Sequence, residues 1–312
     1  MTITAITDLI RTTLELGLIS SLTVLALFIS YSMLNVCDLS TDGCFTLGAA
    51  VGAMVALSGH PVLSIFAAVL AGVLSGLLTG LLQTKMGIDS LLSGIIVNTG
   101  LYSVNIAIMN NSSLVNLNKT ETIFTAAKEL FKDTFFAGYY KIIVIALIVI
   151  LAVVLISLFM RTRLGLAIRA TGDNPAMVKS SSINPVFTTL VGLAVANAFT
   201  GLSGCLMAQS QKSANIDIGT GMLTIALASL LIGRTFMGKG GIPKRAMGVV
   251  IGSVIFRMVY MIALRFKMPA SMLKLVSSVI VIIAISAPYF KSRIPLIKRK
   301  MALKRGEEGK DA

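Results

Sequence analysis

A dense group of polar residues interrupts the apolar sequence between Asn35 and Gly52, where the chain reads NVCDLSTDGCFTLGAAVG. Its two carboxylates, Asp38 and Asp42, flank Ser40. An ionised carboxylate is costly in hydrocarbon, so each one must face a cavity, find a partner or lie at the membrane surface. We predict that both cap a broken helix that borders a central solute pathway. The residues predicted to line or support that pathway are Asn35, Asp38, Ser40 and Asp42.

Several lone polar residues lie inside other apolar segments: Asn98, Asn105, Asn197 and Arg257. We assign Asn98 and Arg257 to the same pathway. The stronger candidate is Arg257, because a cation midway along an apolar segment is costly without a partner or water. A further polar group, Gln209, Gln211, Asn215 and Asp217, is a candidate outer vestibule. The alternative for the Asn residues is a hydrogen bond between helices, and for Asp38 and Asp42 it is a capped surface turn.

The sequence offers no set of residues for catalysis or metal binding. It has one His and three scattered Cys, which exclude a disulfide framework and a His-rich metal site. The segment from Gly233 to Gly240, GRTFMGKG, follows a membrane helix and ends in Gly where a phosphate-binding loop needs Ser or Thr. We therefore expect no catalytic residue, no metal and no cofactor, and we expect any ATP to be bound by another subunit.

Composition indicates a helical membrane protein. Of 312 residues, 55% are hydrophobic and 13% are charged, and the mean hydropathy is +0.89. Two shorter or glycine-interrupted apolar segments, Phe45–Ser58 and Met222–Ile232, are candidates for broken helices. We predict an all-α polytopic transmembrane helical bundle of about seven to ten spans, some broken or re-entrant. The segments long enough to cross about 30 Å of hydrocarbon are Leu14–Val36, Val62–Leu82, Leu91–Met109, Ile142–Met160, Phe187–Met207, Met247–Leu264 and Leu273–Ala287.

The net charge of +14 is concentrated in short polar segments. Basic residues gather in 161–185, in 234–245 and after Phe290, whereas three lysines are balanced by three acidic residues in 110–138. Short loops rich in Lys and Arg stay cytoplasmic, so we place the three basic segments inside and 110–138 outside. The predicted domains are a transmembrane domain, 1–290, and a basic cytoplasmic tail, 291–312, that is attracted to membrane lipid. Without a compact basic domain, we expect no nucleic-acid partner.

The basic loop 161–185 contains a helix start. Asn174 can cap free amide groups, and Pro175 fits the first helical position. We predict a short helix from Pro175 to about Ile183 that lies under the membrane and contacts a soluble partner; an ordinary solvated loop is the alternative. The residues assigned to this contact are Arg169, Gly172, Asp173, Asn174, Pro175, Ala176, Met177 and Val178.

Three stretches carry a family resemblance: DLSTDGCFTLGAAV from Asp38, RATGDNP from Arg169 and GLSGCLMAQ from Gly201. Over nearly its full length the chain resembles permease subunits of ATP-binding-cassette (ABC) importers in the branched-chain amino acid, ribose and simple-sugar group, in particular those for tryptophan or tyrosine. Cys44 departs from the usual Ser. The resemblance implies a bacterial plasma-membrane location, a permease homodimer or pseudo-dimer, cytoplasmic ABC ATPase subunits, and an extracytoplasmic substrate-binding protein or lipoprotein.

Two other function classes remain as alternatives. A stand-alone secondary transporter would usually show inverted repeats and titratable groups at mid-membrane, where only Arg257 clearly qualifies. A membrane enzyme would need a clustered acid/base or metal set, for which Asp38 and Asp42 are the sole candidates. We expect an importer permease for a small solute. The resemblance suggests an amino acid, and an aromatic one in particular, with nucleosides and sugars as alternatives.

Overall fold

The computed structural model describes residues 3–130, 138–237 and 240–265, with isolated positions between 275 and 286. In this part of the chain, six helices are long and apolar enough to cross a membrane. They are α1 (Ile3–Leu27, continued by the π-helical turn η1, Phe28–Met33), α3 (Leu63–Thr84), α4 (Ser90–Ile108), α6 (Tyr140–Phe159), α9 (Pro185–Gln211) and α11 (Ile242–Arg265). The polytopic helical bundle is confirmed. The predicted tail, 291–312, and most of the predicted span Leu273–Ala287 lie outside the described residues.

Two further apolar helices are shorter, as predicted: α2 (Thr41–Leu57) and α10 (Met222–Met237). Between η1 and α2 the chain has little regular structure, and Asn35 adopts a left-handed φ of 57°. Ser40, just before α2, is fully buried. The helix α2 therefore starts inside the bundle, and its later residues pack against the outer elements around Val115 and Ala214.

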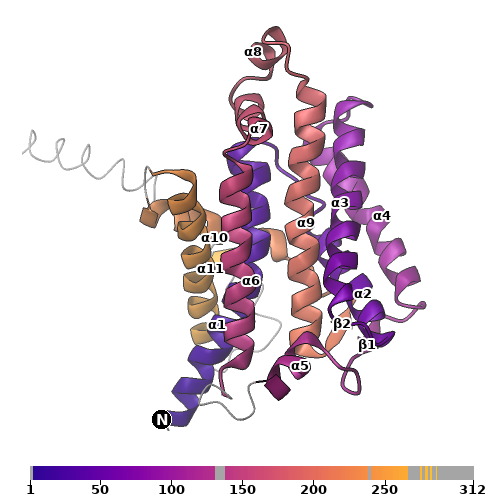
Figure 1. Ribbon diagram of the computed structural model, residues 1–312, viewed down its shortest axis with the longest axis vertical. Coiled ribbons are helices and arrows are strands. Elements are labelled where there is room, and N and C mark those ends of the chain that lie inside the picture. Colours follow the sequence, from indigo (N-terminus) through magenta and orange to yellow (C-terminus); the bar gives the residue numbers. More distant parts are fainter. Residues whose placement is uncertain are drawn as a thin grey trace, which may run out of the picture.

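The remaining elements lie at the two ends of the bundle (Figure 1). At one end are α7 (Arg163–Asp173) and α8 (Pro175–Ser180). At the other end are α5 (Ile123–Leu130), the start of α1, and the strands β1 (Leu114–Asn116) and β2 (Ser213–Asn215). The strands pair antiparallel, and the described residues are otherwise helices and their connections. Residues 110–130 and 161–185 thus lie at opposite ends, in keeping with the charge pattern.

Close glycine contacts hold α2, α3 and α9 together. A Cβ atom added to Gly48 would collide with the carbonyl oxygen of Gly201, and one added to Gly76 would collide with that of Leu193. Small residues let helix backbones approach closely, which is how membrane helices gain packing energy. Gly52 makes a similar close contact, since a Cβ atom there would meet Cys205 on α9.

We expect Gly48→Val to lower the thermal stability of the purified protein strongly. The added side chain meets backbone, which cannot rotate away, and overpacking of this kind costs about 1–3 kcal/mol or more. The matched control is Gly100→Val on α4, because a Cβ atom there would meet nothing within 4 Å. The apparent Tm in detergent measures both. Equal Tm values for the two variants would contradict the packing described for α2 and α9.

Candidate functional site

Asp42 joins the two short helices. Its carboxylate accepts hydrogen bonds from the backbone amides of Gly221, at 2.9 Å, and Leu223, at 2.7 Å. Asp42 therefore caps α10, and the prediction that it caps its own helix is wrong. The N-cap residue of α2 is Ser40, and its side chain makes no capping hydrogen bond. The free amide groups of α10 attract this carboxylate because a helix start carries partial positive charge.

Asp38 is held in a buried hydrogen-bond network. One carboxylate oxygen accepts bonds from the amide and hydroxyl of Ser40, at 2.8 and 2.6 Å, and the other accepts one from Asn197 Nδ2 at 2.7 Å. The hydroxyl of Thr79 donates to Ser40 Oγ at 3.3 Å. Asp38 is 2% exposed. The network ties the segment before α2 to α3 and α9, and neither Asp38 nor Ser40 lines the cavity described next.

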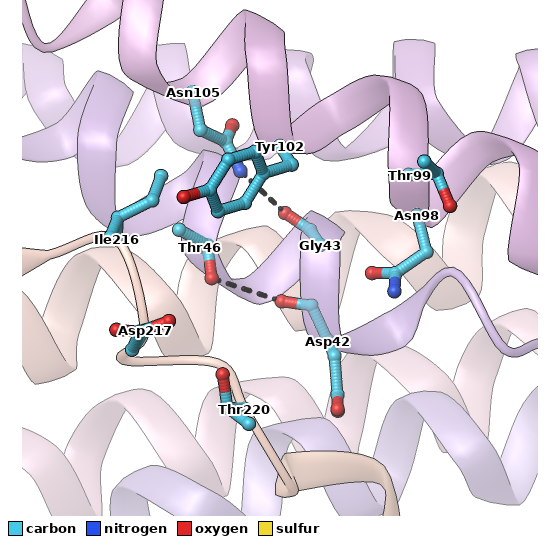
Figure 2. Close-up of a pocket in the computed structure, with 10 residues that line it drawn as sticks. All are labelled: Asp42, Gly43, Thr46, Asn98, Thr99, Tyr102, Asn105, Ile216, Asp217 and Thr220. Atoms are coloured by element: carbon cyan, nitrogen blue, oxygen red, sulfur yellow. Dashed lines mark hydrogen bonds between the residues drawn. The ribbon is translucent and has the colours of Figure 1, made fainter. Parts of the chain in front are cut away.

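A polar cavity of about 320 Å³ lies between α2, α4 and the connection from β2 to α10. Figure 2 shows its lining side chains converging from these three elements. Two predicted pathway residues, Asp42 and Asn98, line it, as does Asp217 from the candidate vestibule. The full lining is Asp42, Gly43, Thr46, Asn98, Thr99, Tyr102, Asn105, Ile216, Asp217 and Thr220.

The sequence analysis did not single out the lining residues Thr46, Tyr102 and Thr220. Asn98, Tyr102 and Asn105 are spaced by four and three residues, which places them on one face of a helix. That spacing was a usable signal on α4. Thr46 and Thr220 carry no comparable local signal, because α2 and the β2–α10 connection meet only in the folded protein. Gln209 is wholly buried and links α3 and α5 through Ser64 and the amide of Ile123.

Asn35 and Arg257 are not among the residues that line this cavity. Asn35 is exposed in the segment before α2. Arg257 is 8% exposed and donates two hydrogen bonds to Ser20 Oγ, at 3.1 and 2.9 Å. Its guanidinium also lies 5.8 Å from the centre of the Tyr260 ring. No acidic partner of Arg257 occurs among the residues that the structure describes.

At the opposite end, Asn174 caps α8 as predicted. Its side-chain oxygen accepts hydrogen bonds from the amides of Ala176 and Met177, both at 3.1 Å, and Pro175 is the first helical residue. The helix ends at Ser180, before the predicted Ile183, whose amide turns back to the carbonyl of Val178.

Some residues assigned to the partner contact on α7 and α8 face outward, and others are buried in the protein. Met177 is 67% exposed, whereas Val178 is 3% exposed and packs inward. The prediction that Val178 presents an outward apolar contact is therefore wrong. Gly172, at the end of α7, packs against the backbone of Met33 and Leu34. Arg169 is half-buried and Asp173 is exposed.

The polar groups that line the cavity suit a small polar solute better than a metal ion. Within the described ranges, no group of three or more His, Cys, Asp or Glu side chains is placed to hold a metal ion. What the cavity does offer is carboxylate, amide, hydroxyl and phenol groups next to two helix starts. Such groups bind a small polar solute by hydrogen bonds and charge.

A family model described as "Branched-chain amino acid transport system / permease component" matches residues 9–285. The chain belongs to this permease family. The permease is 33% identical over 267 residues to a tyrosine transport system permease protein of Clostridioides difficile, covering 85% of this chain and 86% of that one. It is 31% identical over 215 residues to the D-allose transport system permease protein of Escherichia coli, covering 66% and 63%.

The permease also matches an uncharacterized Rickettsia prowazekii protein, at 28% identity over 90% of this chain and 98% of that one. No solved structure matches the permease significantly. The chain is thus a multi-pass permease component of an ABC-type transport system.

Proposed function

We propose that this permease forms the membrane pathway of an importer for a small solute and is driven by a separate cytoplasmic ATPase. The observation that carries the proposal is the polar cavity at the junction of two short helices, with Asp42 bridging them. Discontinuous helices in transporters expose backbone and polar groups to solutes inside the membrane. We include Asn35, Asp38, Ser40, Asp42, Asn98 and Arg257 in the pathway or its support.

The proposed orientation follows from charge. The end with α7 and α8 carries the basic loop 161–185 and is assigned to the cytoplasm. The end with α5 and the β-ribbon then faces outward and offers the surface for a substrate-binding protein or lipoprotein. The basic tail, 291–312, is assigned to the cytoplasm, and the membrane to the bacterial plasma membrane.

The ATPase is proposed to dock on α8. Met177 is exposed at the end of the molecule, next to Ala176, and provides an apolar contact for a groove of the partner. Gly172 and Asn174 shape the turn that carries α8, and Arg169 and Asp173 are proposed to orient it. Such docking transmits movement only if the partner binds α8 differently in its two states.

A second copy of the chain is proposed to complete the pathway. Polar side chains of α4 near the cavity, Thr99, Tyr102 and Ser103, are exposed in the middle of an apolar span. The Thr99 hydroxyl donates to the carbonyl of Ile95 at 2.9 Å, whereas the Tyr102 and Ser103 hydroxyls have no partner among the described residues and would gain none from lipid. A homodimer that covers this face of α4 would keep them next to a water-filled pathway.

The solute is proposed to be an amino acid, and an aromatic one in particular, because a relative is named for tyrosine transport. A sugar is the alternative, favoured by the relative named for D-allose. Co-purification of the tagged permease with a cytoplasmic ABC ATPase tests the proposal. We expect a stable complex that Met177→Glu weakens. A permease that transports solute without any ATPase would contradict the proposal and indicate a secondary transporter.

A further inference from the structure

We propose that the cavity between α2, α4 and the β2–α10 connection binds the positively charged amine of the solute through the Asp217 carboxylate and the Tyr102 ring. This inference rests on the proposed function and narrows its substrate class to amine-bearing solutes, in preference to neutral sugars. Asp217 belongs to the chain that leads into α10, and Tyr102 to α4, so the two groups approach the solute from different elements (Figure 2).

The charges that line the cavity have one sign. Among its described lining residues, Asp42 and Asp217 are acidic and none is Lys or Arg. Both oxygens of Asp42 already accept hydrogen bonds from the start of α10, which offsets part of its charge. The Asp217 carboxylate is exposed and makes no hydrogen bond within the described part of the chain. It is therefore available to a cationic ligand, with which a carboxylate forms its strongest hydrogen bonds.

A second lining residue, Asn105, has an acceptor oxygen that receives no hydrogen bond from the described residues. Asn105 is 1% exposed, and its amide nitrogen donates to the carbonyl of Gly43 at 3.2 Å. Its side-chain oxygen has no partner among the described residues. A buried acceptor without a partner is costly. This oxygen is covered in the structure, so an N–H group of the solute reaches it only when the Asn105 side chain turns into the cavity. An ammonium carries three such donors and no acceptor.

Tyr102 supplies an aromatic surface on the same face of α4. It lies three residues before Asn105 and is 52% exposed. The face of an aromatic ring attracts an ammonium group, most strongly where water is excluded. The hydroxyls of a sugar can donate to the same oxygens, but they carry no charge and so gain less from the carboxylate and the ring than an ammonium does. The carboxylate, the unpaired amide oxygen and the ring together match an amine.

The charge of the cavity can be measured in the full-length permease in lipid nanodiscs. Thr220→Cys places a thiol in the lining, and Cys37→Ser removes the half-buried native thiol, while Cys44 and Cys205 are buried. The labelling rates with a cationic and an anionic methanethiosulfonate are compared. Adding Asp217→Asn is expected to lower the cation-to-anion rate ratio about three- to tenfold. Thr99→Cys is a second reporter position should Thr220→Cys fold poorly.

The matched control is Asp89→Asn, which makes the same chemical change at the start of α4. Asp89 caps that helix through the amide of Leu91 and does not line the cavity, and Asn caps equally well. We expect the rate ratio to stay unchanged in this variant. An equal effect of the two substitutions, or no effect of Asp217→Asn, would overturn the assignment of Asp217.

Ligand protection identifies the group that is bound. Tyramine, which keeps the amine of tyrosine, is expected to slow labelling, whereas 3-(4-hydroxyphenyl)propanoate, which lacks it, and D-allose are not. Protection by either of the latter at the same concentration, or none by tyramine, would overturn the amine site. Labelling needs no ATPase and no transport. A permease that passes this test but shows no ATP-driven uptake would therefore contradict the proposed function and leave the amine site standing.

Discussion

Asp42→Ala is expected to reduce solute uptake at least tenfold while membrane insertion stays intact. The substitution removes the acceptors of two half-buried backbone amides at the start of α10, and an amide left without a partner costs up to about 1–3 kcal/mol. The start of α10 and the adjacent Thr220 then lose their fixed position against α2, so one wall of the cavity is displaced. The measurement is uptake into proteoliposomes that contain permease, ATPase and binding protein, normalised to the amount of permease.

Two further variants test whether the loss of uptake comes from the missing hydrogen-bond acceptors of Asp42. Asp42→Asn keeps one acceptor oxygen and is expected to fall between wild type and Asp42→Ala. Asp8→Ala removes an exposed carboxylate near the start of α1 and is expected to transport normally. Full uptake by Asp42→Ala would show that the link between α2 and α10 is not needed for transport.

Met177→Glu is expected to abolish most of the ATPase stimulation by loaded binding protein, with a loss of tenfold or more. Met177 is exposed on α8, so a charge there leaves the fold intact, and it would oppose the apolar groove proposed for the ATPase. Substitution of Gly172 would be a poorer test, because a side chain there collides with the backbone of Met33 and Leu34. The readout is ATP hydrolysis in liposomes with and without loaded binding protein.

The matched control for Met177 is Met86→Glu. Met86 is 69% exposed in the turn between α3 and α4, at the same end of the molecule as α8 (Figure 1). This variant makes the same chemical change away from α8 and is expected to keep its ATPase stimulation. Unchanged ATPase stimulation in Met177→Glu would instead place the coupling contact elsewhere, most simply in the basic segment 234–245.

Features with a local cause were predictable from the sequence. Apolar length predicted the helices, and the short segments predicted α2 and α10 because hydrophobic runs map directly onto spans. Asn174 and Pro175 marked the start of α8, since the cap and its amides lie within three residues of each other. The helix α7 was missed because its buried residues, Gly165, Ile168 and Thr171, give only a weak apolar stripe in a basic segment.

Features with a distant cause were not predictable. Asp42 binds amides 179 and 181 residues away, so nothing near it in the sequence shows which helix it caps. The same holds for Asp38, whose partner Asn197 is 159 residues away. Val178 was misplaced because a helix as short as α8 does not show which side packs inward. The cavity itself exists only where α2, α4 and the β2–α10 connection meet.

The most direct test of the account is ATP-driven uptake by the reconstituted complex. Permease, its ATPase and its binding protein are placed in liposomes with radiolabelled L-tyrosine on the side of the binding protein and ATP on the side of the ATPase. We predict accumulation of tyrosine that requires ATP hydrolysis and stops when the ATPase is omitted. Accumulation that continues without the ATPase, driven by an ion gradient alone, would contradict the account.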